Sequence, residues 1–383
     1  MTVGASGQMW LVRPMTRRRK LAVAVGIGAL ALLLGWLEMA PDLRTSPLAS
    51  HDDGGLSAVA APPPSQSPVA VIGRGGLDGG GAPAAGLPAG AEVLARFGWG
   101  SGDEALGREH QPEGNPEGPM SLTVGADGSI FVLDQVNQRL VRLDAKGKRL
   151  SSTALPLQAA QDVVVTKDGT ALVMDRLVDK AVAVIGPDGK QKGELPLEGK
   201  GLSEGGASTG LFNDGDDVLV EREHGDLVRI GKSDGTKDAE RGEVPGRPSK
   251  DGASYLTAVI VDPARGLFSL TAIAKANLEH RFTRQVSFGQ AILALVMLDS
   301  DAAGLSYVGA HAELPGSTPE APRLGIVVLC LDGRDGATLG RTSFPANAVA
   351  DESFRELSVG SDGSILFLRR TTEGAQLERH RCQ

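Results

Sequence analysis

Side chains that commonly perform chemistry are scarce in this sequence, and those present do not form known catalytic patterns. Its 383 residues include six histidines and two cysteines, and aromatic residues make up only 4%. The histidines, at positions 51, 110, 224, 280, 311 and 380, show no HExxH motif or paired metal spacing. No nucleophile elbow, phosphate-binding loop or EF-hand calcium loop can be recognised. We therefore expect a binding protein rather than an enzyme.

Positive charge is scarce beyond residue 44. Residues 1–44 hold six of the 39 basic residues and two of the 47 acidic ones, which leaves 33 basic and 45 acidic residues in the remainder. The net charge of that remainder is −12. A domain with this charge is not attracted to phosphate backbones or to anionic lipid. Nucleic acid is therefore not an expected partner.

The N-terminal part combines a basic segment with a long apolar run. Residues 1–20 end in Arg17-Arg18-Arg19-Lys20, and Leu21–Leu37 contains seventeen residues without a charge. Residues 21–40 approach the roughly 20 residues that cross a bilayer, and the basic flank should stay in the cytoplasm. The sequence predicts a single-pass inner-membrane signal-anchor with a cytoplasmic N-terminus and a periplasmic or extracytoplasmic C-terminal domain. Cleavage as a signal peptide remains an alternative, whereas a lipoprotein anchor is excluded because no cysteine lies nearby.

Residues 41–91 form a separate compositional segment. Proline, glycine, alanine and serine dominate it, as in APPPSQSP and GRGGLDGGGAPAAGLPAG. Such a segment cannot bury enough apolar surface to offset the entropy of ordering, so it is expected to be a disordered, flexible linker. As a coil of this length it has a root-mean-square reach of roughly 40 Å. The linker would separate the membrane anchor from a domain at 92–383.

Within residues 92–383 a repeat decides the fold class. Asp-Gly pairs between apolar runs stand at 127–128, 168–169 and 214–215, which are 41 and then 46 residues apart. Such pairs are strong hairpin signals, and a period of 40 to 50 residues with four strands per unit is typical of propeller blades. The sequence predicts an all-β, six-bladed β-propeller, with five or seven blades as alternatives. Because the last unit offers three strands, Glu92–Trp99 is expected to supply its outer strand and close the ring.

The later units are less regular. We expect a fourth blade at Tyr255–Phe288 with Pro-Ala-Arg-Gly at its first turn, a fifth at Ala291–Phe344 and a sixth at Glu356–Cys382. Tight Asp-Gly turns are expected at one end of the ring. The long connections are expected at the other end, where binding usually resides; they are 100–119, 198–209, 246–254, 312–323 and 346–355.

The first unit, GPMSLTVGADGSIFVLDQVNQRLVRLDAKGK, resembles an NHL repeat, in which an apolar strand, Asp-Gly, a strand ending in Asp and Asn-x-Arg follow one another. The second unit keeps this frame but has Asp175-Arg176-Leu177-Val178-Asp179-Lys180 in place of Asn-x-Arg. The resemblance covers about 80 residues well and only the strand pattern beyond them. It implies a propeller and no single activity.

Glu117-Gly118-Pro119 is more distantly similar to the start of the gluconolactonase/SMP-30 propeller family. In that family the glutamate binds a divalent metal in the central channel, which implies a metal role for Glu117, with Asp162 as a second candidate. The alternative function is therefore a metal-dependent, lactonase-like hydrolase using an ion such as calcium. Two carboxylates do not complete such a site, so we expect no cofactor and interpret Glu117 as a solvated residue.

The expected binding face surrounds the mouth of the channel. Its candidates lie in or near the strand connections: Glu117, Asp134, Arg139, Asp162, Asp175, Glu221 and Arg222. For the stretch from Asp134 to Arg139 we favour a structural interpretation, because Asx side chains commonly hydrogen-bond the backbone of turns. The function expected from these features is a membrane-anchored binding or scaffold module for a protein or glycan partner.

Cys330 and Cys382 fall in the fifth and sixth units. Neighbouring blades could bring them together, and a disulfide is permitted outside the cytoplasm. Sequence does not determine their geometry, so their pairing stays open.

Overall fold

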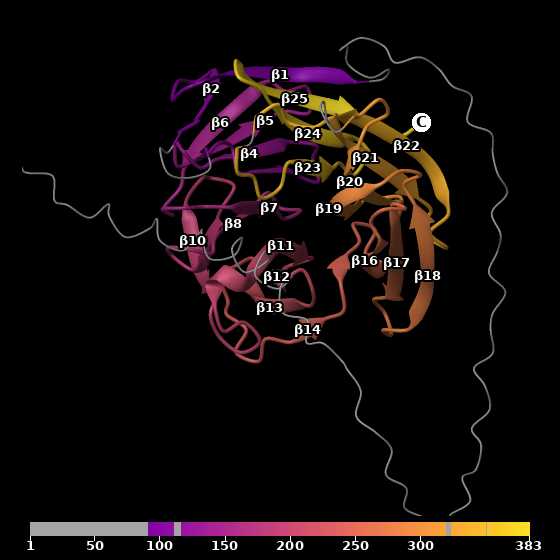
Figure 1. The fold of residues 1–383 in the computed structure, drawn as a ribbon. Coiled ribbons are helices and arrows are strands. Elements are labelled where there is room, and N and C mark those ends of the chain that lie inside the picture. The colour runs from indigo at the N-terminus through magenta and orange to yellow at the C-terminus, as the bar shows by residue number, and fades with distance from the viewer. Residues whose placement is uncertain (1–90, 111–115, 319–322, 350) are drawn as a thin grey trace, which may run out of the picture. The chain divides into compact units, whose positions relative to one another are not determined.

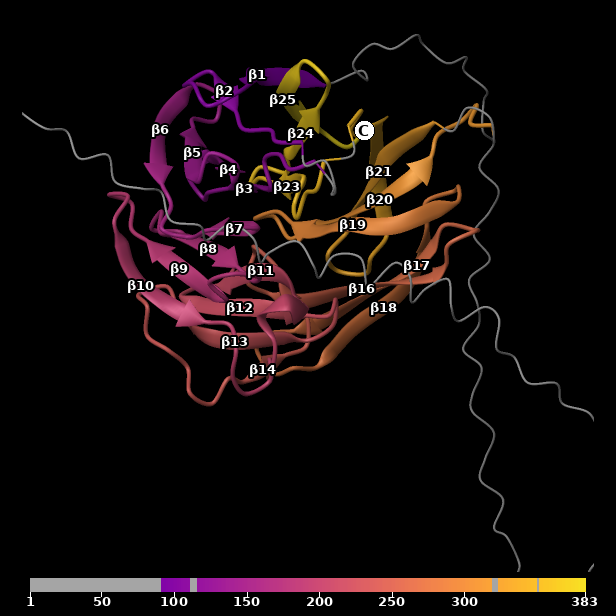
Figure 2. The ribbon, with the colours of Figure 1, turned by 60° about the vertical axis from the view of Figure 1, so that its left-hand side comes forward.

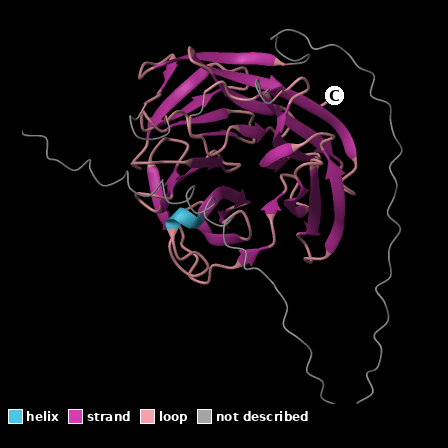
Figure 3. Ribbon diagram, viewed as in Figure 1, coloured by secondary structure: helices cyan, strands magenta, loops and turns pink. Residues whose placement is uncertain are grey.

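The computed structural model describes residues 91–110, 116–318, 323–349 and 351–383. The basic segment 1–20, the expected anchor 21–40 and all but the last residue of the linker 41–91 lie outside these ranges. Within the described ranges, no helix is long and apolar enough to cross a membrane. The chain there is a six-bladed all-β propeller with one short 3-10 helix, η1 (Gly205–Ala207), as Figures 1 and 3 show.

Blades one to five are sheets of four antiparallel strands in chain order, and the sixth blade is a five-stranded sheet completed by the N-terminal strands (Figure 2). Blade one contains β3 (Ser121–Val124), β4 (Ile130–Asp134), β5 (Arg139–Leu143) and β6 (Arg149–Ala154); blade two contains β7 (Asp162–Val165), β8 (Ala171–Asp175), β9 (Ala181–Ile185) and β10 (Gln191–Pro196). Blade three contains β11 (Ser208–Asp214), β12 (Asp217–Arg222), β13 (Leu227–Lys232) and β14 (Glu243–Val244); blade four contains β15 (Arg247–Pro248), β16 (Ser254–Asp262), β17 (Leu267–Ala274) and β18 (His280–Ser287).

Blade five contains β19 (Ile292–Ser300), β20 (Ser306–Glu313), β21 (Leu324–Leu331) and β22 (Thr338–Pro345). Blade six contains β23 (Leu357–Val359), β24 (Ile365–Arg370) and β25 (Gly374–His380), followed outward by β1 (Glu92–Trp99) and the short parallel β2 (Ala105–Leu106). The pairing of β1 with β25 is antiparallel and sets Phe97 opposite Ala375. The prediction that Glu92–Trp99 closes the ring is therefore confirmed.

The Asp-Gly pairs form the tight turns that the sequence predicts. Gly128 has φ of +78°, a conformation that favours glycine, and its N–H donates to Gly125 O at 2.9 Å. Asp127 Oδ1 accepts the N–H of Ser129 at 2.9 Å. The turns at Asp168-Gly169 and Asp362-Gly363 repeat this arrangement. We call this end of the ring the turn end, and the opposite end, which holds the connections from β1 to β3, from β10 to β11 and from β22 to β23, the loop end.

Blade four differs from the expectation. Pro263-Ala264-Arg265-Gly266 joins its second and third strands rather than its first and second. The first turn holds Asp251-Gly252, where Gly252 N–H donates to Ser249 O at 2.9 Å. Residues 249–253 therefore lie at the turn end and not among the loop-end connections. The expectation was wrong because the innermost strand, β15, has two residues and leaves no alternation in the sequence.

The hydrophobic core is divided into clusters between neighbouring blades. Alternate side chains of a strand point to opposite faces of its sheet, so each blade can pack against both neighbours. Clusters of this kind lie between blades one and two, two and three, four and five, five and six, and six and one. The innermost strands surround the channel, and Ser121 of β3 forms a parallel bridge with Arg355 of the neighbouring blade six.

Candidate functional site

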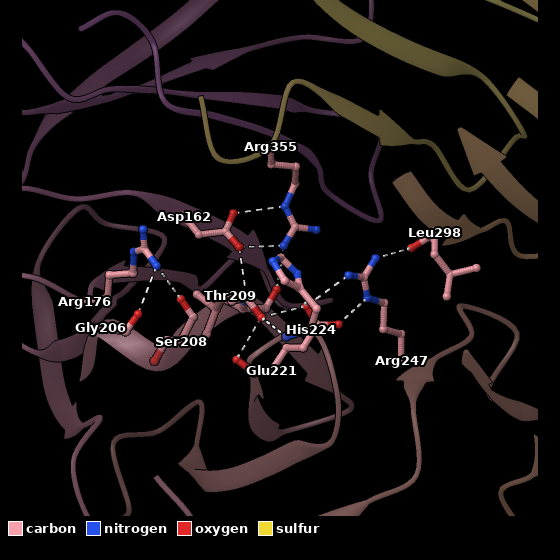
Figure 4. A network of polar contacts seen from close by, with 11 residues as sticks. Asp162, Arg176, Gly206, Ser208, Thr209, Glu221, His224, Arg247, Leu298 and Arg355 are labelled. Atoms are coloured by element: carbon pink, nitrogen blue, oxygen red, sulfur yellow. Dashed lines mark hydrogen bonds and ion pairs between the residues drawn. The ribbon is translucent and has the colours of Figure 1, made fainter. Parts of the chain in front are cut away.

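The channel contains a buried ion pair that joins three blades. Asp162, the first residue of β7, is completely buried and accepts Arg355 Nε at 3.0 Å and Nη2 at 2.6 Å. Its carboxylate also accepts the N–H groups of Val163 and Leu211, each at 2.9 Å. Arg355 Nη2 donates in turn to Leu211 O at 2.7 Å. Arg355, which lies two residues before β23, is thereby tied to the innermost strands of blades two and three, and Figure 4 shows its pairing with Asp162.

A second ion pair crosses from blade three to blade four. Glu221, at the end of β12, accepts Arg247 Nε at 2.8 Å and Nη2 at 3.1 Å. Arg247 Nη1 donates to Leu298 O of β19 at 3.4 Å, which extends the contact to blade five (Figure 4). Two parallel N–H···O bonds to one carboxylate hold a guanidinium in a defined orientation. Arg247 is therefore fixed by the pair rather than free to follow a ligand.

Phe212 of β11 lies between the two arginines. Its ring centroid is 4.9 Å from Arg247 Cζ and 5.1 Å from Arg355 Cζ. Stacking of a guanidinium on an aromatic face adds attraction while the polar edge stays available for hydrogen bonds. For Arg355, burial lowers the pKa, but the charges of Asp162, Asp299 and Glu221 outweigh burial and raise the pKa. The guanidinium therefore stays charged.

Lys250 and Asp299 form a third connection. Lys250 Nζ donates to Asp299 Oδ1 and to Val359 O, both at 2.6 Å, and so joins blades four, five and six. In each of the three pairs the charge of the cation is offset by that of its own carboxylate. The cavity that they leave, lined also by Phe354 and Met297, has a volume of about 60 Å³, which is room for a few water molecules. At this level of the ring the protein's own side chains leave little free space.

Among the residues predicted for the binding face, Asp134 and Arg139 make hydrogen bonds within the protein. Asp134 is completely buried, and its carboxylate accepts Gly107 N–H at 2.8 Å, Asn137 Nδ2 at 2.8 Å and Arg139 Nε at 2.7 Å. Arg139 also donates to Ala105 O at 2.7 Å. These bonds tie the loop after β4 to the segment that follows β1. These are the contacts that the structural interpretation of this stretch predicts, and Asp134 does not present its side chain at the surface.

Asp175 has a similar role in blade two. It is completely buried and accepts N–H groups of Ala159, Leu177 and Val178 at 2.8 to 3.1 Å. Burial raises the pKa of Asp175, although these N–H donors act in the opposite direction. Arg222, in contrast, is half-buried at the rim, where it donates to Gly201 O at 2.6 Å. Of the seven predicted residues, the structure brings only Asp162 and Glu221 into the channel network.

Glu117 lies at the loop end beside two other glutamates. It forms backbone bridges with Glu109 and Glu352, and it is half-buried while those two are exposed. Burial raises the pKa of Glu117, and the negative charges of Glu109 and Glu352 raise it further. We call these three residues the glutamate group. Close by, Arg108 donates to both oxygens of Asp351 at 3.0 to 3.1 Å.

A metal site at Glu117 and Asp162 stays a prediction. Both oxygens of Asp162 are engaged by Arg355 and by backbone N–H groups, so this carboxylate has donors rather than a cation as partners. Among the described residues, no group of three or more His, Cys, Asp or Glu side chains is arranged to hold a metal ion.

The decisive partners in the channel were missed from the sequence. Arg247, Arg355 and Phe212 carry no local motif, and Arg355 is 193 residues away from Asp162 in the chain. A weak signal was available, because Arg355 precedes the innermost strand of blade six and Asp162 begins that of blade two. Only the closed ring brings these two positions together.

Cys330 of β21 and Cys382, which follows β25, form a disulfide. The bond joins blade five to the C-terminal end of blade six. Because β1 closes blade six from the other side, the two ends of the domain are held at one blade by a strand pairing and a covalent bond.

No family model and no curated protein matches this chain. Similar solved structures include hydrazine synthase from Kuenenia stuttgartiensis, at 13% identity and a TM-score of 0.41 over 65% of this chain and 72% of that one. They also include a streptogramin B lyase, at 10% identity and a TM-score of 0.40 over 72% and 97%, and a duf4221 family member from Bacteroides vulgatus, at 11% and 0.42 over 76% and 97%. This likeness concerns the β-propeller fold. The finer resemblance to NHL repeats stays a prediction.

Proposed function

We propose that this chain is a membrane-anchored β-propeller of a bacterial envelope that acts as a binding or scaffold module. The observation that carries the proposal is the small cavity beside the channel ion pairs of Arg247 and Arg355, which has a volume of about 60 Å³. This space is far below the roughly 300 Å³ at which small-molecule sites begin. A ring whose axis is occupied by its own side chains recognises a partner with its outer surface.

The envelope location rests on two features. The basic residues before Leu21 and the apolar residues 21–40 favour an anchor with the N-terminus in the cytoplasm. The bond between Cys330 and Cys382 is of a kind that persists in oxidising compartments. A reporter fused after Gln383 should accordingly be active in the periplasm; activity of a cytoplasmic reporter there instead would contradict the proposed topology.

The loop end supplies the recognition surface in this proposal. Its long connections are held by Asp134, by Arg108 with Asp351, and by the channel pairs, so the loops stand on a fixed base. The glutamate group gives this surface a negative patch. Its repulsion is relieved when a cation approaches, which favours a protein partner with lysine and arginine side chains over a neutral glycan.

The test replaces all three carboxylates of the glutamate group in the full-length chain: Glu109→Gln, Glu117→Gln and Glu352→Gln. The matched control is Asp216→Asn with Glu279→Gln, two exposed acids at the turn end. Partners captured from detergent-solubilised membranes are compared at low and high salt. The glutamate variant should lose most of a salt-sensitive capture without a lower melting temperature. If the control variant lost capture of the partner and the glutamate variant kept it, recognition would lie at the turn end and the proposal would be wrong.

A further inference from the structure

One of the six junctions between blades differs from the other five. Hydrophobic clusters occupy the junctions between blades one and two, two and three, four and five, five and six, and six and one. Among the residues that the structure describes, no such cluster lies between blades three and four. We call this junction the seam. It lies between the sheet of β11 to β14 and the sheet of β15 to β18 (Figure 1).

Blade four is buried on one face and open on the other. Phe268, Leu270 and Val286 belong to the cluster shared with blade five and are at most 6% exposed. The alternating positions of β16 point away from that cluster, toward blade three, and there Val259 is 62% and Val261 48% exposed. In β17 the corresponding face is half-buried throughout, and in β18 it is exposed. The apolar side chains that β16 presents to the seam are thus in water rather than in a core.

Polar contacts hold the seam instead. Arg247 pairs with Glu221, Tyr255 Oη donates to Asp214 Oδ2 at 3.3 Å, and Lys275 Nζ pairs with Asp214 Oδ1. All of these groups except Glu221 are partly exposed. Ion pairs reached by solvent contribute little free energy and weaken with salt, whereas a buried apolar cluster does neither. The seam is therefore the weakest junction of the ring.

We propose that the ring opens at the seam while the other five junctions remain closed. Opening at the chain ends is opposed by the pairing of β1 with β25 and by the disulfide between blades five and six. Opening at the seam requires the polar contacts to separate and exposes the buried Leu219 and Leu227 of blade three, but it breaks no shared apolar cluster. Thr209, Phe212 and Arg247 line both the seam and the channel cavity, so the motion exposes the channel network from the side.

Cysteines introduced at two neighbouring positions of β12 can be used to measure this motion. Leu219 is 1% exposed and belongs to none of the five clusters, whereas Val218, which points to the opposite face, is 0% exposed within the cluster of blades two and three. Single variants Leu219→Cys and Val218→Cys are treated with a thiol reagent under native conditions. The natural cysteines do not compete, because both are in the disulfide. The experiment is repeated with Leu227→Cys and Val228→Cys on β13. Leu227 is buried outside the five clusters, and Val228 is buried in the cluster of blades two and three.

The thiol introduced at 219 should react at least about tenfold faster than the one at 218, because local opening needs less free energy than global unfolding. High salt, or Arg247→Gln added to each variant, should accelerate the reaction at 219 and leave that at 218 unchanged. Melting temperatures of all variants identify any that fail to fold. Equal rates at 219 and 218 in the folded protein, or equal acceleration of both, would overturn the proposal.

Discussion

Replacement of Asp162 tests the channel network most directly. In Asp162→Ala the guanidinium of Arg355 loses both hydrogen bonds to its carboxylate, and the N–H of Leu211 loses its acceptor. Breaking a buried pair by removing one partner costs about 3–5 kcal/mol, and an orphaned buried N–H adds about 1–3 kcal/mol. Because the side chain of Arg355 is 21% exposed and water can reach it, we take the low end, about 4 kcal/mol.

The assay is urea unfolding of residues 91–383, in which domain stabilities are typically about 5–15 kcal/mol. The double variant Asp162→Ala with Arg355→Met should lose less than the sum of the two single losses, because it leaves no uncompensated charge. Asp162→Asn should fall between the wild type and Asp162→Ala, since its carbonyl oxygen can still accept from Leu211. The losses of Asp162→Ala, Arg355→Met and the double variant together define the coupling of the pair.

Two results would refute this reasoning. A decrease below about 1 kcal/mol in the free energy of unfolding for Asp162→Ala would mean that the carboxylate does not stabilise the ring. If a chelator destabilised the wild type as much as Asp162→Ala does, Asp162 would be a metal ligand rather than the partner of Arg355. The comparison therefore separates the structural role from the metal site that the sequence suggested.

Three further predictions concern closure, the disulfide and pH. Phe97→Ala should lower the free energy of unfolding by about 3–5 kcal/mol, because Phe97 is buried between blades six and one; an unchanged urea midpoint would argue against strand closure. Cys330→Ser with Cys382→Ser should lose about 4 kcal/mol for a separation of 52 residues, and a reductant should then have no further effect on the double variant's midpoint. The pKa of Glu117 is raised above its ordinary value of 4.5, so folding favours its protonated form and loses that contribution as pH rises through the raised pKa. Glu117→Gln should therefore increase the melting temperature at pH 7 and not at pH 4, and an equal shift at both would contradict the assigned cause.

Much of the propeller could be predicted because its hairpin turns are specified by residues that are neighbours in the chain. An Asp-Gly pair between two apolar runs specifies a hairpin through the φ values that glycine tolerates and through the bonds of one aspartate, as at Asp127-Gly128. The closing role of Glu92–Trp99 followed from counting strands, since a ring needs a partner for β25. Blade four was misread at its start, because β15 is too short to show any alternation.

The sequence by itself determined the repeat and the turn end, since each depends on residues that are neighbours in the chain. Tertiary structure alone decided that Asp162 meets Arg355, that Glu221 meets Arg247, and that the seam lacks an apolar cluster. Those pairings depend on how six blades close around one axis, with partners up to 193 residues apart along the chain. The residues next to Asp162 in the chain do not specify which charged side chain will contact it once the ring has closed.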